Sequence, residues 1–407
     1  MNCRHCHKPL SQVFLDLGHA PPSNAYLSAA DLRAPELTYP LRLFVCGNCY
    51  LVQTEDYATS EALFSSDYAY FSSTSRGWMS HAAAYVEQVI GRLGLGPESF
   101  VVEVASNDGY LLRNFVAAGI PCLGIEPTDS TAAAAEALGI PVLREFFGAE
   151  LGARLAGQEK QADLIMGNNV YAHVPDINDF TLGLAQALKP EGVITLEFPH
   201  LMRLVEFAQF DTVYHEHFSY LSLLVVSRIF AAAGLRVFDV EQLPTHGGSL
   251  RVWGCHAGAQ HSDTPQVAAL LAEEQARGMA DSRYYEAFQQ RANTVKDALL
   301  QFLLQAKRDG KSVAGYGAAA KGNTLLNYAG VKPDLLSFIC DAAAAKQGKF
   351  MPGSHIPILP PAALSEQRPD YVLILPWNIA EEVRGQLAPL GRAGTRFVTA
   401  VPELCIA

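Results

Sequence analysis

The chain lacks any apolar run as long as a membrane-spanning helix, which needs about 18 such residues in a row. Its first residues, Met1 to Cys6, lack the basic, apolar and small-residue regions of a secretory signal. Positive charge is also scarce, because 30 Lys and Arg stand against 41 Asp and Glu for a formal net charge of −11. A nucleic-acid partner needs clustered Lys and Arg that release counterions. We therefore expect a cytoplasmic protein that binds neither membrane nor nucleic acid and that holds any anionic small molecule with local groups.

A disulfide framework is missing as well. Of the eight cysteines, four are scattered singly and four form two close pairs, Cys3-x-x-Cys6 and Cys46-x-x-Cys49. Each pair would make one knuckle that aims two sulfurs at a single ion, so the four thiolates predict a tetrahedral, structural zinc site. Four free cysteines or a redox dithiol are the alternatives, and the absence of a strand–helix pattern around either pair disfavours the dithiol. A histidine, His5, His7 or His19, could replace one ligand.

Hydrophobic periodicity divides the rest of the chain into two similar halves. The strands predicted in the first half, each followed by helical sequence or a turn, are 100–104, 122–125, 163–166 and 193–197, and those in the second are 312–315, 338–340 and 370–375. Strands separated by helical stretches predict parallel sheets, whose ligands lie at the carboxyl ends of the strands. The repeated plan predicts an internal duplication.

Length and composition agree with several domains. With 407 residues, 49% of them hydrophobic and 17% charged, the chain can form two or three cores. We expect an α/β fold with a zinc-knuckle region at 1–75, a Rossmann-like parallel-sheet domain at 76–240 and a second Rossmann-like domain, with connecting helices, at 241–407. Helices are predicted at 81–95 and 268–307, and the proline-rich stretch 350–361 is predicted to be a surface loop.

The first glycine turn, residues 103–109, lacks the three glycines of a dinucleotide fingerprint. An acid-started turn with one glycine is typical of methyltransferases, in which Ala105 and Gly109 would leave room for the methionine part of S-adenosylmethionine. Glu126, at the tip of the second strand, could accept hydrogen bonds from a ribose diol. The predicted cofactor-binding residues are Glu103, Ala105, Ser106, Asn107, Gly109, Glu126, Asn168 and Asn169. A Rossmann-like domain without this cofactor is the alternative.

The second turn, residues 315–323, matches neither Walker sequence. It places small residues and a lysine just before a helix, where exposed backbone N–H groups gather phosphate. We therefore predict a diphosphate pocket with Tyr316, Lys321 and Asn323, and a nucleotide-activated acceptor. A purely structural sheet domain is the alternative.

Between the halves, the segment 210–221 is dense in groups that move or hold protons. Two histidines, His215 and His217, would share one face of an extended segment, with Glu216 opposite, so that one imidazole could act as a base. A histidine pair packed in the core and a catalytic metal bound by His-x-His with a nearby carboxylate are the alternatives.

Taken together, these motifs resemble the sugar C-methyltransferases of deoxysugar pathways. The resemblance covers essentially the whole chain and rests on the paired Cys-x-x-Cys knuckles and on residues 102–112, 168–176, 214–220, 246–251 and 315–323. It implies a zinc-binding N-terminal region, a middle domain that binds S-adenosylmethionine and a related C-terminal domain, with a nucleotide-diphosphate 4-keto-6-deoxysugar between the last two. In that family the methyl group goes to carbon 3, whose proton the adjacent ketone makes removable.

The resemblance also implies roles for single residues. His217 becomes the base, Tyr214 and Glu216 bind or orient the sugar, and His173 and Tyr68 support the reacting carbon. Further substrate contacts would come from His215 and His246, and the zinc would be structural. Two alternative functions are a nicotinamide-dependent oxidoreductase that uses the second turn and Asp341, and a non-enzymatic zinc-knuckle interaction protein. We expect the protein to be a monomer or a small oligomer.

Overall fold

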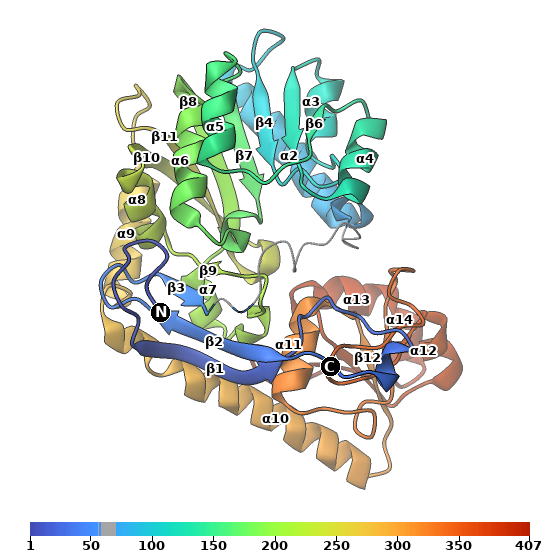
Figure 1. Ribbon diagram of the computed structural model, residues 1–407. Coiled ribbons are helices and arrows are strands. Elements are labelled where there is room, and N and C mark those ends of the chain that lie inside the picture. The colour runs from blue at the N-terminus through green and yellow to red at the C-terminus, as the bar shows by residue number, and fades with distance from the viewer. Residues whose placement is uncertain (56, 58–70) are drawn as a thin grey trace.

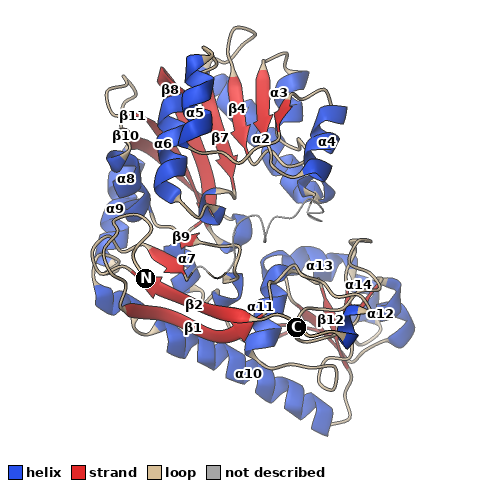
Figure 2. Cartoon of the chain, viewed as in Figure 1, coloured by secondary structure: helices blue, strands red, loops and turns tan. Residues whose placement is uncertain are grey.

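The computed structural model describes residues 1–55, 57 and 71–407. Figure 1 shows a seven-stranded sheet unit above a six-stranded one, with a small N-terminal sheet beside them that runs along helix α10 (Phe288–Arg308). Helices flank both larger sheets (Figure 2). The predicted α/β class with a cysteine-rich N-terminal region is confirmed.

The N-terminal sheet is antiparallel, in the order β1-β2-β3-β9. Its strands are β1 (Gln12–Ala20), β2 (Tyr39–Val45), β3 (Val52–Thr54) and β9 (Ser219–Tyr220). Phe14 of β1 stacks on Phe288 of α10 with 4.6 Å between ring centroids, which joins this sheet to the helix. Because Val52 pairs with Tyr220, the N-terminal sheet holds the end of the histidine-rich segment as its own edge strand.

The seven-stranded sheet has the order β10-β11-β8-β7-β4-β5-β6. Its strands are β4 (Val101–Val104), β5 (Cys122–Ile125), β6 (Val142–Leu143), β7 (Ala162–Asn168), β8 (Leu188–Pro199), β10 (Leu235–Leu243) and β11 (Ser249–His256). Its helices are α2 (Arg76–Leu93), α3 (Leu112–Ala117), α4 (Asp129–Ala137), α5 (Ala149–Gly157), α6 (Ile177–Ala187), α7 (Leu201–Glu206) and α8 (Leu223–Ala232). Strands β4 to β8 pair in parallel, and β10 and β11 pair antiparallel. β4 is buried along its whole length, as expected of an inner parallel strand. The sheet includes β11, which follows residue 240, where the sequence places a domain boundary.

The six-stranded sheet has the order β14-β13-β12-β15-β16-β17. Its strands are β12 (Val313–Tyr316), β13 (Ile339–Cys340), β14 (Ile358–Leu359), β15 (Tyr371–Ile374), β16 (Arg396–Thr399) and β17 (Cys405–Ile406). The helices α9 (Pro265–Ala276) and α10 lead into it, and α11 (Ala320–Tyr328), α12 (Ala362–Gln367), α13 (Ala380–Gln386) and α14 (Ala388–Arg392) belong to it. Its five parallel strands follow the order of β6-β5-β4-β7-β8. The two units share a plan, while a duplication of the sequence stays a prediction.

The proline-rich segment 350–361 is not the surface loop that its composition predicts. Met351 and Ile356 are 0% exposed, and Phe350 forms an isolated bridge with Leu27 of the N-terminal region. Prolines interrupt regular structure, but they do not stop the apolar residues between them from entering a core. The segment therefore packs within the six-stranded unit and contains β14.

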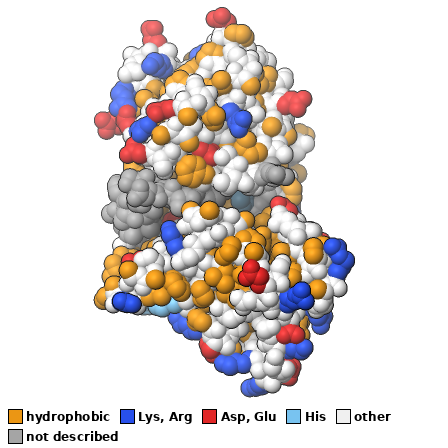
Figure 3. All heavy atoms as spheres, turned by 90° about the vertical axis from the view of Figure 1, so that its right-hand side faces the viewer, with side chains coloured by type: hydrophobic (Ala, Val, Ile, Leu, Met, Phe, Trp, Pro, Cys, Tyr) orange, Lys and Arg blue, Asp and Glu red, His pale blue; other side chains and the backbone are white. Residues whose placement is uncertain are grey.

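The face shown in Figure 3 differs between the two larger units. Hydrophobic side chains gather over the lower unit, and Lys and Arg are interspersed with Asp and Glu around the edges of both. Positive charge on this face is therefore dispersed rather than gathered into one patch.

Candidate active site and zinc centre

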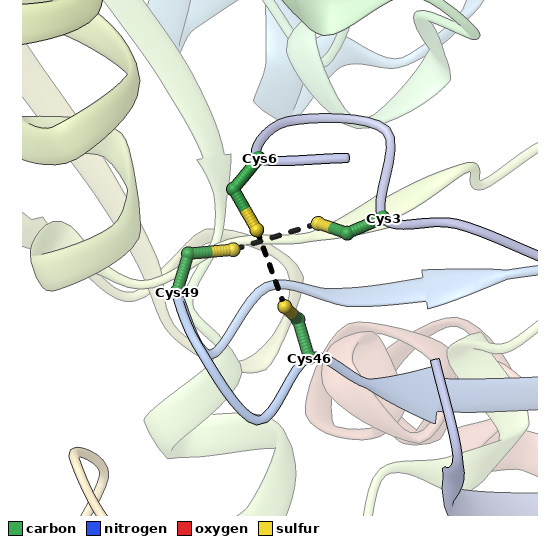
Figure 4. A group of neighbouring side chains, drawn as sticks. All are labelled: Cys3, Cys6, Cys46 and Cys49. Carbon is green, nitrogen blue, oxygen red and sulfur yellow. Dashed lines mark hydrogen bonds between the residues drawn. The ribbon is translucent and has the colours of Figure 1, made fainter. Parts of the chain in front are cut away.

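The four cysteines predicted as zinc ligands converge beside the N-terminal sheet (Figure 4). Their Sγ atoms all lie within 4.8 Å of one another, with 3.5 Å from Cys3 to Cys49 and 3.5 Å from Cys6 to Cys46. Tetrahedral zinc with Zn–S bonds of about 2.3 Å needs sulfurs about 3.8 Å apart, so this group fits the ion. Gln53 donates Nε2–H to the sulfur of Cys3 at 3.3 Å, a contact that favours the thiolate. Within the described ranges, no other group of side chains has a metal-holding geometry.

The turn after β4 has left-handed backbone at three predicted cofactor-binding residues. The φ angles are 57° at Ala105, 50° at Asn107 and 75° at Gly109. A Cβ atom at Gly109 would lie 2.4 Å from Cδ1 of Ile140, so this position needs glycine for space as well as for φ. The space beside Gly109 is filled by Ile140, and room for a cofactor at Ala105 stays a prediction.

Two predicted carboxylates flank this turn. Glu103 is buried on β4 beside Tyr110, and its burial together with the charge of Glu126 raises the pKa of its carboxyl well above the ordinary value. Glu126, just after β5, accepts the backbone N–H groups of Asn107 at 2.9 Å and Thr128 at 3.0 Å. The carboxylate therefore braces the turn at the strand end where a ribose is expected.

The side chains of Ser106 and Asn107 in this turn make structural contacts. The Ser106 hydroxyl occupies the space above Gly124, where a Cβ would lie 2.5 Å from its oxygen. The Oδ1 atom of Asn107 accepts the backbone N–H of Ser72 at 3.0 Å and so anchors the segment that enters α2. A direct contact of either side chain with a cofactor stays a prediction.

At the end of β7, residues predicted for cofactor and for substrate lie next to each other. The Asn168 amide lies beside the Tyr110 hydroxyl, and Nδ2 of Asn169 lies 3.1 Å from Nε2 of His246. The Trp78 ring of α2 lies 5.4 Å from the His246 ring and 6.0 Å from the Tyr110 ring, between centroids. An aromatic side chain of α2 thus joins the polar groups at this edge of the sheet.

A buried ion-pair cluster, which sequence reasoning missed, supports the same edge. Oε2 of Glu197 lies 2.7 Å from Nη2 of Arg251 and 2.8 Å from Nε2 of His81, and the guanidinium carbon lies 4.3 Å from the centre of the Tyr85 ring. Although burial opposes ionisation, the bonds to His81 and Arg251 hold the pKa of Glu197 below its ordinary value. The pairing depends on the register of β8 and β11, which puts Arg251 opposite Glu197.

His217, the predicted base, has its tautomer fixed by a hydrogen bond. Its Nδ1 lies 2.8 Å from the carbonyl oxygen of Thr212. A carbonyl only accepts hydrogen bonds, so Nδ1 carries the proton and Nε2 carries the lone pair. Burial and the neighbouring His173 hold the pKa of His217 well below its ordinary value, so the imidazole is neutral near pH 7. The rings of Tyr214 and His173 lie 3.9 Å and 4.6 Å from it, between centroids, which brings three predicted catalytic residues together.

The prediction that His215 and His217 share one face is wrong. The N–H of His217 donates to the carbonyl of Tyr214 at 3.0 Å and closes a turn, whereas alternation by two applies only to strands. Nε2 of His215 lies 3.2 Å from the carbonyl of Pro40 in β2, and its ring meets Tyr39 edge-on. The two imidazoles bind different carbonyls and do not form a His-x-His ligand set. The role of His215 in substrate binding stays a prediction.

Glu216 is buried and bound by a residue that sequence reasoning missed. Nδ2 of Asn24 donates to both carboxylate oxygens, at 3.0 Å and 2.9 Å. Burial raises the pKa of Glu216 to about 7, and the Asn24 bond opposes this rise. Tyr26, in the same N-terminal stretch, donates its hydroxyl to the carbonyl of Ala318 at 2.6 Å. The stretch therefore links the histidine segment to the second glycine turn, and no spacing in the sequence indicated this.

Lys321 brings positive charge from the six-stranded unit toward His217. Its Nζ donates to Oδ1 of Asn378 at 2.7 Å and lies 4.7 Å from the centre of the Trp377 ring. The indole N–H of Trp377 in turn donates to Oδ2 of Asp211 at 2.7 Å, across the two units. Burial lowers the pKa of Lys321, and its charge contributes to lowering the pKa of His217.

The other two predicted contacts of the second turn are engaged within the fold. The Tyr316 hydroxyl donates to Oε1 of Gln386 at 3.2 Å, and Nδ2 of the buried Asn323 donates to the carbonyl of Ser23 at 3.4 Å. Their contact with a substrate stays a prediction. Tyr68, the fifth predicted catalytic residue, lies outside the described residues.

Three family models match successive parts of the chain. A zinc binding domain matches residues 3–64, a methyltransferase domain matches 78–240 and a C-methyltransferase C-terminal domain matches 244–402. The chain is 35% identical to the C-methyltransferase NovU of Streptomyces niveus over 98% of this chain and 95% of that protein. None of the helices in the described part of the chain has the length and apolarity to cross a membrane.

Solved structures of lower similarity include two methyltransferases. Magnesium protoporphyrin IX methyltransferase from Synechocystis PCC 6803 is 14% identical, with a TM-score of 0.34 over 44% of this chain and 80% of that one. An S-adenosylmethionine-dependent methyltransferase from Clostridium acetobutylicum ATCC 824 is 10% identical, with a TM-score of 0.35 over 44% of this chain and 92% of that one.

The full-length relative and the three family models agree with the motifs read from the sequence. The methyltransferase match and the four-cysteine group confirm the expected cofactors, S-adenosylmethionine and a structural zinc ion. The chain therefore belongs to the C-methyltransferase family.

Proposed function

We propose that this C-methyltransferase transfers a methyl group to carbon 3 of a nucleotide-diphosphate 4-keto-6-deoxysugar. The proposal is supported by motifs, from the N-terminal knuckles to the second glycine turn, that resemble sugar C-methyltransferases. The relative from Streptomyces niveus is itself named a C-methyltransferase. A sugar carbon becomes nucleophilic only when a base removes the proton next to a ketone, so the site must contain a base.

The observation that carries the proposal is the neutral, oriented imidazole of His217. Its Nδ1–H is held by the Thr212 carbonyl, which leaves the Nε2 lone pair to take the proton from carbon 3. The electron pair of that C–H bond moves toward the ketone at carbon 4 and gives an enediolate, whose carbon 3 then attacks the methyl carbon. When bound, S-adenosylmethionine would supply this methyl group as an electrophile, with the neutral thioether S-adenosylhomocysteine as the leaving group that takes the electron pair of the broken S–CH3 bond.

The surrounding residues orient and charge-balance the sugar. Tyr214, His173 and Glu216 lie around or next to the base and would bind the sugar hydroxyls and ketone, together with His246. Lys321 would hold the negative charge of the acceptor, because its partly buried ammonium is held by Asn378 on the side of the six-stranded unit. This charge also favours a neutral His217, which is the form that can accept a proton.

The cofactor would be held at the carboxyl ends of β4, β5 and β7. Glu126 would accept the ribose hydroxyls, and Asn168 and Asn169 would line the adenine and methyl-donor side, with Ala105 leaving room beside the turn. The buried Asn168 amide supports binding of the cofactor at this place, because besides its contact with the Tyr110 hydroxyl it has further hydrogen-bonding positions for a ligand.

Solvent exchange at carbon 3 tests the base directly. In D2O, His217→Gln and His217→Ala should abolish deuterium incorporation into a nucleotide 4-ketosugar, followed by NMR, while calorimetry shows unchanged binding of S-adenosylmethionine. His19→Gln, a change of an exposed histidine on β1, is the matched control and should exchange like the natural protein. Exchange at the natural rate in both His217 variants would remove His217 as the base.

A panel of nucleotide 4-ketosugars tests the acceptor class. Mass spectrometry after incubation with S-adenosylmethionine should show a gain of one methylene in at least one member, and NMR should place it on carbon 3. Transfer to an oxygen, or to no member of the panel, would reject the proposal. A change in NADH or NADPH absorbance with the same sugars would instead support the oxidoreductase reading.

A further inference from the structure

Arg4, which lies inside the first cysteine knuckle, reaches out of the zinc centre to the segments that carry the paired histidines. Its Nη1 donates to the carbonyl of Pro175 at 2.5 Å, and its Nη2 donates to the carbonyl of Thr54 at 3.1 Å. Its guanidinium carbon lies 5.3 Å from the centre of the Phe218 ring. Pro175 follows His173 by two positions, so a single side chain touches one histidine segment through a carbonyl and the other through a ring.

The backbones of the two histidine segments meet at the same place. The N–H of Phe218 donates to the carbonyl of Ala172 at 2.8 Å, and the carbonyl of Phe218 accepts the N–H of Thr54 at 3.1 Å. Ala172 precedes His173 and Phe218 follows His217. The hydrogen bond between Phe218 and Ala172 therefore sets the T-shaped contact of the His173 and His217 rings. The guanidinium of Arg4 lies over the Phe218 ring at this junction.

The knuckle holds Arg4 from its other side. The backbone N–H of Arg4 donates to Oε1 of Gln53 at 2.9 Å, and Nε2 of the same glutamine donates to the sulfur of Cys3. Nδ2 of Asn178 donates to the carbonyls of Arg4 and His5, at 3.2 Å and 2.9 Å. A continuous series of contacts thus runs from a zinc ligand through Gln53 and Arg4 to the histidine junction.

We propose that Arg4 is a positioning residue through which the zinc knuckle sets the geometry of the His173–His217 pair. This inference rests on the proposed role of His217 as the base. Only a guanidinium can bind two carbonyls with one planar fork and stack on an aromatic ring at the same time, and a lysine in its place would lose part of this set. A reacting group displaced by about 1 Å can lose roughly 100-fold in rate.

The test uses Arg4→Lys and Arg4→Ala in the full-length, zinc-loaded protein. With a nucleotide 4-ketosugar that the natural protein converts, kcat should fall roughly 10-fold in Arg4→Lys and roughly 100-fold in Arg4→Ala. KM for S-adenosylmethionine should stay within about twofold and zinc at one ion per chain. Long-range proton–nitrogen NMR of labelled histidine gives a readout independent of turnover, because the Nδ1–H tautomer of His217 should be lost or mixed in both variants.

Arg228 on α8 offers a matched control at the second knuckle. Its Nη1 donates to the carbonyl of Asn48 at 3.2 Å, and its guanidinium carbon lies 5.5 Å from the centre of the Tyr50 ring. Both partners belong to the second knuckle and neither belongs to a segment that carries His173 or His217. Arg228→Ala should therefore keep the natural kcat and tautomer. An equal loss in Arg228→Ala would overturn the specific role of Arg4.

The natural kcat and tautomer in Arg4→Ala, with zinc in place, would likewise overturn it. If Arg4→Ala fails to keep zinc, Arg4→Lys decides by the same two measurements. Natural carbon 3 exchange in His217→Gln would reject the base itself, whereas natural exchange in the Arg4 variants with none in His217→Gln would reject only the positioning role.

Discussion

Replacing Glu216 by Gln should make the protein more stable at high pH. The carboxyl is buried and its principal polar contact is the Asn24 amide, so burial raises its pKa from 4.5 to about 7. A change of 1 in a pKa corresponds to about 1.4 kcal/mol of free energy. Keeping this carboxylate ionised in the folded protein therefore costs about 3 kcal/mol of folding free energy. A Gln side chain keeps an acceptor for Asn24 and removes the charge.

The sign follows from proton binding. Between pH 4.5 and about 7 the folded state keeps a proton on Glu216 that the unfolded state has lost, so the free energy of unfolding falls as the pH rises through this window. Glu216→Gln lacks this fall. Its advantage over the natural protein should therefore be small near pH 4.5 and should grow by about 3 kcal/mol by pH 8, while methyl transfer is lost if the carboxylate orients the sugar.

Urea unfolding curves at pH 5, 6, 7 and 8, followed by intrinsic fluorescence, measure this difference. Glu98→Gln, at an exposed carboxylate, is the control and should show the same small difference at every pH. A difference between Glu216→Gln and the natural protein that does not change with pH would refute the raised pKa and the burial that causes it.

Three further outcomes follow from single features of the fold. Cys46→Ser should lower bound zinc below one ion per chain in metal analysis and lower the melting temperature, since structural zinc contributes folding energy; full zinc occupancy would contradict this site. Arg251→Met should destabilise the protein by about 3 to 5 kcal/mol in urea unfolding, because it leaves the Glu197 carboxylate buried without its cation, and a cost below about 1 kcal/mol would show that His81 suffices. Gly109→Ala should weaken S-adenosylmethionine binding and stability more than Gly119→Ala, since both have positive φ but only the first adds a Cβ at 2.4 Å from a neighbouring atom; equal effects in calorimetry and melting would leave backbone strain as the only cause.

The features that could be predicted from the sequence are those that depend on residues close together in the chain. Two cysteines separated by two residues aim their sulfurs at one point through a single turn, so the ligand set Cys3, Cys6, Cys46 and Cys49 could be read before the sheet was known. Short apolar runs between helical stretches likewise predicted the parallel strands, because burial on both faces requires such runs. The turn after β4 was predicted from its acidic first residue and its single glycine.

The features that were missed or wrong depend on segments far apart in the chain. Asn24 meets Glu216, and Glu197 meets Arg251, only because sheet register and the path of the N-terminal stretch bring them together. The direction of His215 was wrong because a backbone turn, closed by the carbonyl of Tyr214, replaces the extended segment that simple alternation assumes.

The sequence by itself determined which groups are present and how they are spaced: two cysteine pairs, an acid-started turn and a histidine-rich segment in which we propose a base, because each depends on residue type and short spacing. Only the tertiary structure decided which nitrogen of His217 holds the lone pair, since that depends on the Thr212 carbonyl and on packing against His173. It also decided that the zinc knuckle touches the histidine segments through Arg4, because contacts between distant segments exist only once the sheets have packed.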